Sequence, residues 1–115
     1  MTKGKVVLVP FPFDDLTKTK VRPAVCLTEP IGDHRHVVLA FISSQLPAKP
    51  AMTDVVLTRD RAGFSQTGLK LHSVLRLHRL VTLTANLIER ELGRLSPEMR
   101  READGKLMLL FGLKS

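Results

Sequence analysis

The sequence predicts a mainly β fold: a small, mostly antiparallel sheet curled toward a barrel, with a C-terminal helix packed against it. Short runs rich in valine, leucine and isoleucine fill the first three quarters of the chain, and each is bounded by proline, glycine or polar residues. Helical patterning appears only after them. At 115 residues and 12.8 kDa the chain has room for one hydrophobic core, so we expect a single domain over residues 1–115.

The first half of the chain contains three predicted strands. Residues Lys5–Phe11 are rich in valine, and a polar segment, residues 14–20, follows them after a proline. Residues 22–28 and His36–Ser43 are apolar and prone to β structure, and the connection between them contains Gly32. These two runs are expected to pair as a hairpin.

The second half contains two more predicted strands and then helices. Residues 54–58 form a short strand, and residues 73–83 form the longest one, which is expected to lie centrally in the sheet. Residues 85–92 are predicted to be helical. Another helix is predicted after Ser96, which can cap it, with Pro97 at the first position, where a missing N–H costs nothing. The apolar stripe of this helix consists of Met99, Ala103, Leu107, Leu110 and Phe111.

Charge and cysteine content restrict the class of partner and the compartment. Eighteen Lys and Arg residues against eleven Asp and Glu give a net charge of +7, so the surface is expected to attract a nucleic acid or, equally, an acidic protein. The single cysteine, Cys26, excludes an internal disulfide and is expected to lie in the core. No apolar run approaches the ~20 residues that span a bilayer, and no signal-peptide pattern begins the sequence. We therefore expect a cytoplasmic protein without membrane contact.

Arg22 is the first candidate functional residue, because it precedes Pro23 at the start of a predicted strand, just after a polar segment. Its fixed fork of donors suits a phosphate, and its charge persists at any working pH. A surface salt bridge is the alternative role. Ser43 and Ser44 end an apolar run, where their hydroxyl groups either cap a turn or donate to a phosphate oxygen.

The four histidines raise the question of acid–base or metal chemistry. They are His34, His36, His72 and His78, and no pair among them comes with a matching cluster of carboxylates. We therefore expect no metal site and place the histidines at the surface or the rim of a site. Phe41 and Phe111 are expected to belong to the core.

Five short motifs follow one another along nearly the whole chain. They are Gly4 with the strand and loop of residues 6–13, Arg22-Pro23-Ala24-Val25, Ile42-Ser43-Ser44-Gln45, Gly68-Leu69 ahead of Ser73-Val74, and Leu92-Gly93-Arg94-Leu95-Ser96. In this order they resemble the MazF/PemK family of toxin endoribonucleases. The resemblance implies an SH3-like barrel of antiparallel strands with a C-terminal helix.

The resemblance also implies an activity. Family members cleave single-stranded RNA at specific sequences without a metal or other cofactor: the ribose 2′-hydroxyl attacks the adjacent phosphate and leaves a 2′,3′-cyclic phosphate and a 5′-hydroxyl. The catalytic arginine and hydroxyl of the family fall here on Arg22 and Ser43, a serine where threonine is commoner. The other residues expected to contact RNA are Lys18, Lys20, Ser44, Gln45 and Arg79, the last standing where many relatives begin a Gln-Ile-Arg segment.

Partners follow from the same resemblance. The family forms homodimers with RNA bound across the interface, and an antitoxin with an acidic tail occupies the same groove. A different function remains open, because the related CcdB toxins use this barrel as a non-catalytic module that binds DNA gyrase. A basic structural domain without activity is the third possibility.

Overall fold

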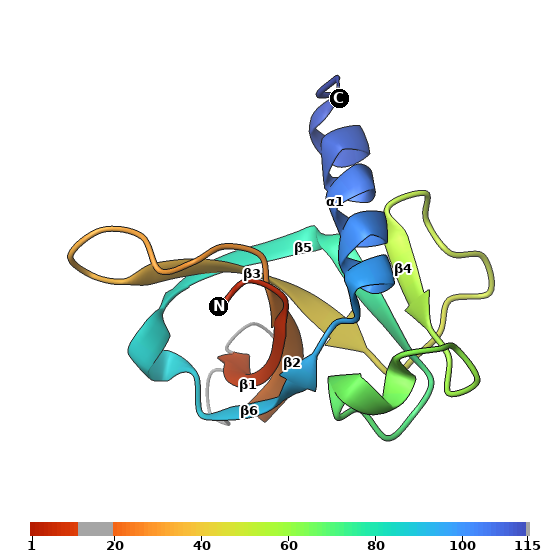
Figure 1. The fold of residues 1–115 in the computed structure, drawn as a ribbon, viewed down its shortest axis with the longest axis horizontal. Helices are drawn as coiled ribbons and strands as arrows, with labels where there is room; N and C mark the ends of the chain where they lie inside the picture. The colour runs from red at the N-terminus through yellow and green to blue at the C-terminus, as the bar shows by residue number, and fades with distance from the viewer. Residues whose placement is uncertain (12–19, 115) are drawn as a thin grey trace.

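A computed structural model describes residues 1–11 and 20–114 of the chain. In these residues six strands form one sheet, and an α-helix follows them (Figure 1). The strands are β1 (Lys5–Phe11), β2 (Lys20–Cys26), β3 (His36–Ser43), β4 (Asp54–Leu57), β5 (Ser73–Thr84) and β6 (Arg90–Arg94). The α-helix α1 spans Pro97–Phe111, and two short 3-10 helices, η1 and η2, span Phe64–Thr67 and Ala85–Leu87.

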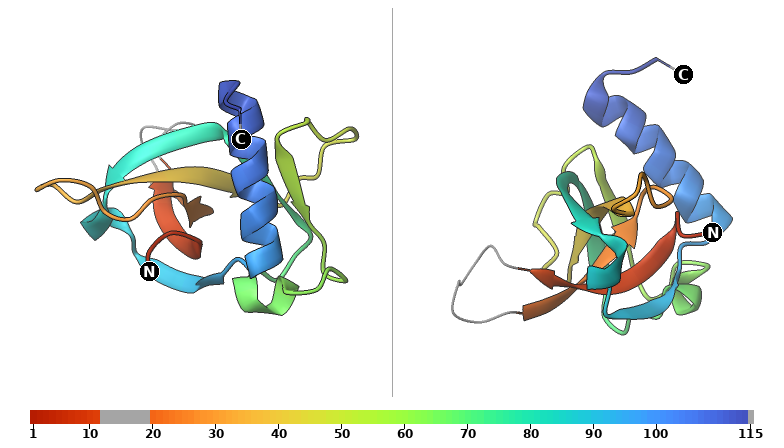
Figure 2. Two further views of the ribbon diagram at one scale, coloured as in Figure 1. Left: turned by 45° about the horizontal axis from the view of Figure 1, so that its top comes forward. Right: turned by 90° about the vertical axis from the view of Figure 1, so that its left-hand side faces the viewer.

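The sheet is antiparallel and curls into a half-barrel (Figure 2). Its strand order is β4-β5-β3-β2-β1-β6. β2 and β3 form the predicted hairpin, and β5, the longest strand with 12 residues, lies between β4 and β3. The predicted mainly β fold with a C-terminal helix is therefore confirmed.

Alternate side chains of the strands fill two separate cores, because successive residues of a strand point to opposite faces. The helix-side core consists of Val6, Val25, Ala40, Ile42, Val55, Leu57, Phe64, Leu75, Leu77, Leu95, Met99 and Ala103. The opposite-face core consists of Val7, Val9, Ala24, Cys26, Val37, Leu39 and Phe41. The buried positions predicted for Cys26 and Phe41 are confirmed.

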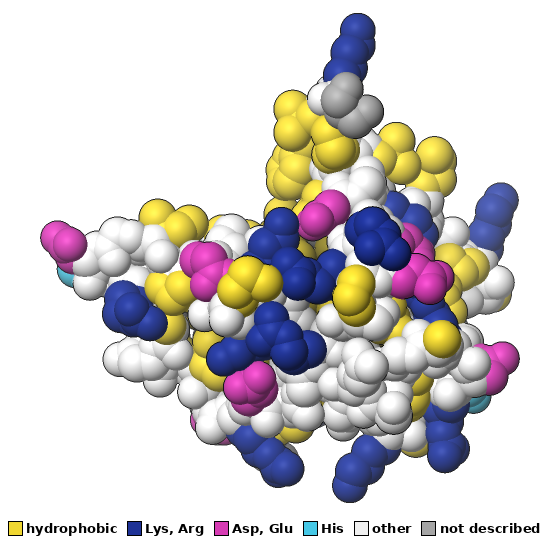
Figure 3. Space-filling model, viewed as in Figure 1, with side chains coloured by type: hydrophobic (Ala, Val, Ile, Leu, Met, Phe, Trp, Pro, Cys, Tyr) yellow, Lys and Arg dark blue, Asp and Glu magenta, His cyan; other side chains and the backbone are white. Residues whose placement is uncertain are grey.

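Helix α1 begins where the sequence predicts. The Ser96 hydroxyl oxygen accepts a hydrogen bond from the backbone N–H of Met99 at 3.2 Å, and Pro97 is the first helical residue. The prediction that Phe111 lies in the core is wrong, because this side chain is 59% exposed. The last turns of α1 extend beyond the sheet (Figure 2), and apolar side chains gather at that free end (Figure 3).

The prediction of a helix over residues 85–92 is also wrong. η2 ends at Leu87, and β6 begins at Arg90 and pairs with the edge of β1. The backbone N–H of Glu89 donates to the Leu8 carbonyl oxygen at 2.9 Å, so the segment satisfies its backbone groups through a distant strand instead of an internal helix. Gly93 lies so close to η1 that a Cβ there would stand 2.2 Å from the Gln66 carbonyl oxygen.

Candidate functional site

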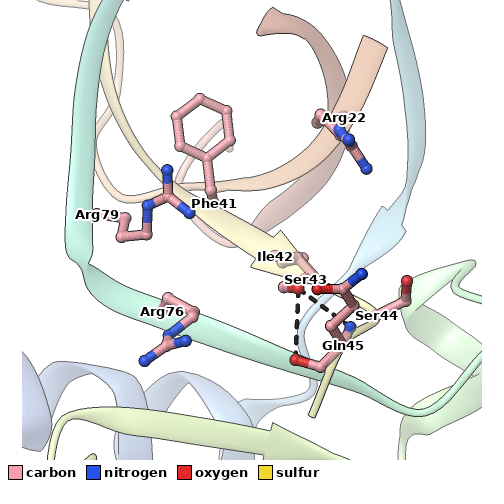
Figure 4. Close-up of a pocket in the computed structure, with 8 residues that line it drawn as sticks. All are labelled: Arg22, Phe41, Ile42, Ser43, Ser44, Gln45, Arg76 and Arg79. Carbon is pink, nitrogen blue, oxygen red and sulfur yellow. Dashed lines mark hydrogen bonds between the residues drawn. The ribbon is translucent and has the colours of Figure 1, made fainter. Parts of the chain in front are cut away.

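A hollow of about 310 Å³ opens beside the opposite-face core, at the end of β3 (Figure 4). Side chains from β2, β3 and β5 and from the turn after β3 surround it. They are Arg22, Phe41, Ile42, Ser43, Ser44, Gln45, Arg76 and Arg79. Five of the seven residues predicted to bind or cleave RNA are therefore brought together in one place.

The pairing of β2 with β3 places Arg22 and Ser43 on the same face of the sheet. Ala24 pairs with Phe41, and both belong to the opposite-face core. Arg22 lies two residues before Ala24, and Ser43 lies two residues after Phe41, so both continue that face away from α1. The apolar alternation that fills the core thus also directs these two polar side chains into the hollow.

An irregularity in the pairing of β3 with β5 brings two more arginines to the hollow. Ala40 pairs with Leu80, but the next residue, Phe41, pairs with Arg76, so three residues of β5 are skipped. The strand turns a corner there, and Arg79 points toward the Phe41 ring in the view of Figure 4. Regular pairing would have separated these groups along the strand.

The Ser43 hydroxyl lies in the tight turn that ends β3. Its oxygen accepts a hydrogen bond from the Gln45 backbone N–H at 3.1 Å, and it donates to the Gln45 carbonyl oxygen at 3.5 Å. The first contact caps the turn, which is one of the two roles that the sequence predicts for this hydroxyl. The second is long for an O–H donor, so the hydroxyl proton is weakly held and can turn to a ligand in the hollow.

The hollow is electropositive. Three guanidinium groups line it, and no carboxylate is among the described residues that line it. Arg22 is exposed and makes no salt bridge with any residue in 1–11 or 20–114, so the alternative role as half of a surface ion pair finds no partner there. Guanidinium groups, hydroxyls and an amide together suit a phosphate, which accepts hydrogen bonds and carries negative charge.

Other predicted residues lie elsewhere. Lys20 is exposed at the start of β2 and does not line the hollow, and Lys18 falls outside the described residues. The four histidines are all exposed, as expected, and none of them lines the hollow.

Arg76 also lines the hollow, although it was not among the residues predicted from the sequence. One signal was available: a charged residue in the middle of the longest predicted strand requires a partner, and an aspartate begins the strand predicted before it. That residue, Asp54, is indeed the partner of Arg76 in the pairing of β4 with β5.

The structure also bears on metal binding, on the reactivity of Cys26 and on membrane-spanning helices. Within residues 1–11 and 20–114, no three His, Cys, Asp or Glu side chains gather closely enough to hold a metal ion. Burial raises the pKa of the Cys26 thiol to about 11, which leaves it protonated and unreactive at neutral pH. No helix in the described part of the chain is long and apolar enough to cross a membrane.

A curled antiparallel sheet with a helix across one face and an arginine-lined hollow on the other defines a small β protein suited to an anionic ligand. A sequence model of PemK-like, MazF-like toxins of type II toxin-antitoxin systems matches residues 2–111. The chain therefore belongs to this toxin family. The comparison with curated proteins gives no match.

Several solved structures share this fold. The Mycobacterium tuberculosis toxin MazF-mt6 superposes with a TM-score of 0.73 at 18% identity, covering 96% of this chain and 99% of that one. An endoribonuclease in complex with its cognate antitoxin from a mycobacterial species gives 0.73 at 14% identity, over 100% and 98% of the chains. MazE-MazF from Deinococcus radiodurans gives 0.67 at 19% identity, over 99% and 97%. At these identities the likeness shows the shared fold.

Proposed function

We propose that the chain is a sequence-specific endoribonuclease toxin that cleaves single-stranded RNA without a metal ion, with Arg22 and Ser43 as its catalytic pair. The observation that supports this most directly is the convergence of these two side chains, from neighbouring strands, on one electropositive hollow. Membership of the toxin family supports the same conclusion.

In the proposed reaction the 2′-oxygen of a ribose forms a bond to the adjacent phosphorus, and the bond from phosphorus to the 5′-oxygen breaks. The products are a 2′,3′-cyclic phosphate and a 5′-hydroxyl, with one proton released from the 2′-hydroxyl to solvent and one gained by the 5′-oxygen. The Arg22 guanidinium holds two phosphate oxygens and stabilises the charge that grows on them. Ser43 orients the phosphate with its weakly held hydroxyl proton.

The remaining contacts position the RNA strand. Ser44, Gln45 and Arg79 line the hollow beside the catalytic pair, where an amide and a hydroxyl can read base edges and a guanidinium can bind phosphate. Lys20 lies outside the hollow, on the strand that carries Arg22, and we assign it and Lys18 to more distant phosphates. The net charge of +7 favours such contacts.

We also propose that a cognate antitoxin binds this chain, that the chain acts as a homodimer and that it works in the cytoplasm. Structures of similar fold include an endoribonuclease in complex with its cognate antitoxin and MazE-MazF. An acidic antitoxin segment would meet the same guanidinium groups as RNA, so the two ligands would compete for the hollow.

The test is to incubate the purified protein, with EDTA present, with a long RNA of known sequence and to map the new 5′ ends. We expect discrete cuts at a recurring sequence. Arg22→Ala should lower the cleavage rate by on the order of 10²–10³-fold, the usual cost of removing one group that stabilises transition-state charge. Arg101→Ala is the matched control, because Arg101 is exposed on α1 and does not line the hollow.

RNA that stays intact across many sequences would contradict the proposal. A stable complex with DNA gyrase under the same conditions would then favour the non-catalytic alternative. Cleavage that persists in Arg22→Ala would instead contradict the assigned catalytic pair.

A further inference from the structure

Arg76 lines the hollow from β5, and a buried carboxylate holds its guanidinium. Nε of Arg76 donates to Oδ1 of Asp54 at 3.3 Å. The Arg76 side chain is 27% exposed, whereas the Asp54 side chain is fully buried. Because Asp54 engages Nε, the two terminal amino groups of Arg76 remain without a hydrogen-bond partner among residues 1–11 and 20–114.

Asp54 is itself held rigidly on three sides. Its Oδ2 accepts a hydrogen bond from the Ala51 backbone N–H at 2.8 Å, and its Cα stands opposite that of Arg76 in the pairing of β4 with β5. Its backbone carbonyl oxygen accepts a hydrogen bond at 2.5 Å from Nζ of Lys106, which lies on α1. The backbone contacts and the Ala51 hydrogen bond therefore hold the carboxylate beside the guanidinium.

A role in stability alone does not account for this ion pair. Taking a carboxylate out of water is costly, and apolar side chains of similar volume often stabilise a fold as well as a buried pair does. A guanidinium fixed through Nε, by contrast, presents its other donors in a set direction, which suits the two-point binding of a phosphate.

The topology places this arginine where a bound strand would pass. β3 lies between β2 and β5, so Arg22 and Arg76 stand on either side of Ser43 (Figure 4). A single-stranded RNA held at Ser43 carries a phosphate on each side of the reacting one. A second guanidinium across β3 from Arg22 therefore meets a neighbouring phosphate of the same strand.

We propose that Arg76 binds an RNA phosphate adjacent to the scissile one, and that Asp54 positions its guanidinium for this contact. The inference rests on the proposed function, because it takes RNA as the ligand. It assigns Arg76 to substrate binding, with Arg22 and Ser43 left as the reacting pair.

Binding to an RNA that cannot be cleaved tests the contact directly. The probe is a short, fluorescein-labelled single-stranded RNA of mixed sequence with a 2′-O-methyl group on every ribose, and its Kd is measured by anisotropy over a range of salt concentrations. Arg76→Gln keeps a donor for Asp54 but removes the charge. We expect its Kd to rise roughly 10-fold and the salt dependence, log Kd against log salt concentration, to lose a slope of about 0.7, the value for one phosphate contact to a single strand.

Asp54→Asn tests the positioning role. It should weaken RNA binding by roughly 3- to 10-fold. In the Arg76→Gln background it should weaken binding no further, because both substitutions remove the same contact. Thermal unfolding of each variant shows whether the protein folds. Arg101→Gln, an equal loss of charge on the exposed side of α1, is the matched control and should change Kd much less.

Two results would overturn the inference. One is an Arg76→Gln variant with the Kd and salt slope of Arg101→Gln, and the other is a wild-type protein that does not bind the probe. A wild-type protein that binds the probe, loses affinity in Arg76→Gln and yet cleaves no RNA would support this inference while contradicting the proposed catalysis. On cleavable RNA, Arg76→Gln should raise KM and change kcat little, whereas Arg22→Ala should lower kcat.

Discussion

The two faces of the curled sheet have opposite characters. The face under α1 is closed: it buries twelve residues, and the helix and η1 cover it. The other face buries seven of the described residues and then opens into a hollow lined by three arginines. The same strands build both faces, since neighbouring residues alternate between them.

This difference separates stability from binding. A substitution on the helix-covered face disturbs close packing, whereas one at the hollow changes charge or a hydroxyl at a solvent-accessible rim. Substitutions at three sites test whether this separation holds, and their expected free-energy effects decrease from the first site to the last.

The largest effect is expected where β6 touches η1. Gly93→Ala would place its Cβ 2.2 Å from the Gln66 carbonyl oxygen, a backbone atom that cannot move independently. We expect the free energy of unfolding to fall by about 3 kcal/mol, the upper range for overpacking, as measured by urea denaturation. Cut sites on RNA should stay the same in the folded fraction.

Gly105→Ala is the control for this substitution. Nothing lies within 4 Å of a Cβ built at this position in α1, and alanine is the better helix former, so the variant should be more stable by roughly 0.5–1 kcal/mol. Equal destabilisation by both variants would mean that the contact between β6 and η1 is not closely packed.

The next effect is expected at the hollow. Ser43→Ala removes a hydroxyl from the proposed catalytic pair and should slow cleavage by on the order of 10²-fold, about 2.7 kcal/mol in the barrier. Its free energy of unfolding should fall by less than about 1 kcal/mol, since the turn loses one hydrogen bond from Gln45. Ser43→Thr retains the hydroxyl and should retain most of the rate. A large loss of stability without loss of cleavage would remove the contrast between the faces.

The smallest effect concerns charge beside the helix-covered face. Burial alone would raise the pKa of Glu102. Hydrogen bonds from Lys106 and Arg61 have the larger effect and hold this pKa below its ordinary value of 4.5. A carboxylate whose pKa is lower in the folded state stabilises the fold above the unfolded-state pKa, and this contribution is lost as the pH falls through the folded-state pKa.

Glu102→Gln should therefore lower the free energy of unfolding by about 1 kcal/mol or less near neutral pH. The difference from wild type should vanish in acid, which urea denaturation at a series of pH values would measure. Glu98→Gln is the control, because Glu98 is 72% exposed and reaches Arg61 only at 4.0 Å. A difference that persists in acid would show that the charge of Glu102 is not responsible.

Local patterns predict most of the fold. Runs of β-branched residues mark β1 to β5, and Ser96 and Pro97 mark the start of α1, because strand alternation and helix capping are properties of nearby residues. The segment 85–92 was predicted wrongly because its partner, β1, lies far away in the sequence. Phe111 fits the apolar stripe of α1, but the stripe does not reveal that the helix extends beyond the sheet and leaves this side chain exposed.

The hollow could be predicted only in part, because it too depends on contacts between strands that are distant in the sequence. Arg22 and Ser43 were candidates because they lie at strand ends, and the family resemblance added their catalytic roles. The pairing of β2 with β3 explains why they converge. Arg76 depends on a register irregularity and on a partner in another strand, and no local pattern of β5 contains either. Pairing between distant strands therefore forms one wall of the hollow, and local sequence patterns do not reveal it.

The skipped residues of β5 have an evolutionary consequence. The register of β5 with β3 skips Leu77, His78 and Arg79, and of these only Leu77 is buried. Because the side chains of residues 78 and 79 are exposed, substitutions there leave the strand ladder and both cores in place. Under the proposed function, a library randomised at these two positions should yield folded proteins with altered RNA cut sites, since residue 79 lines the hollow, and related chains can diverge at the same positions.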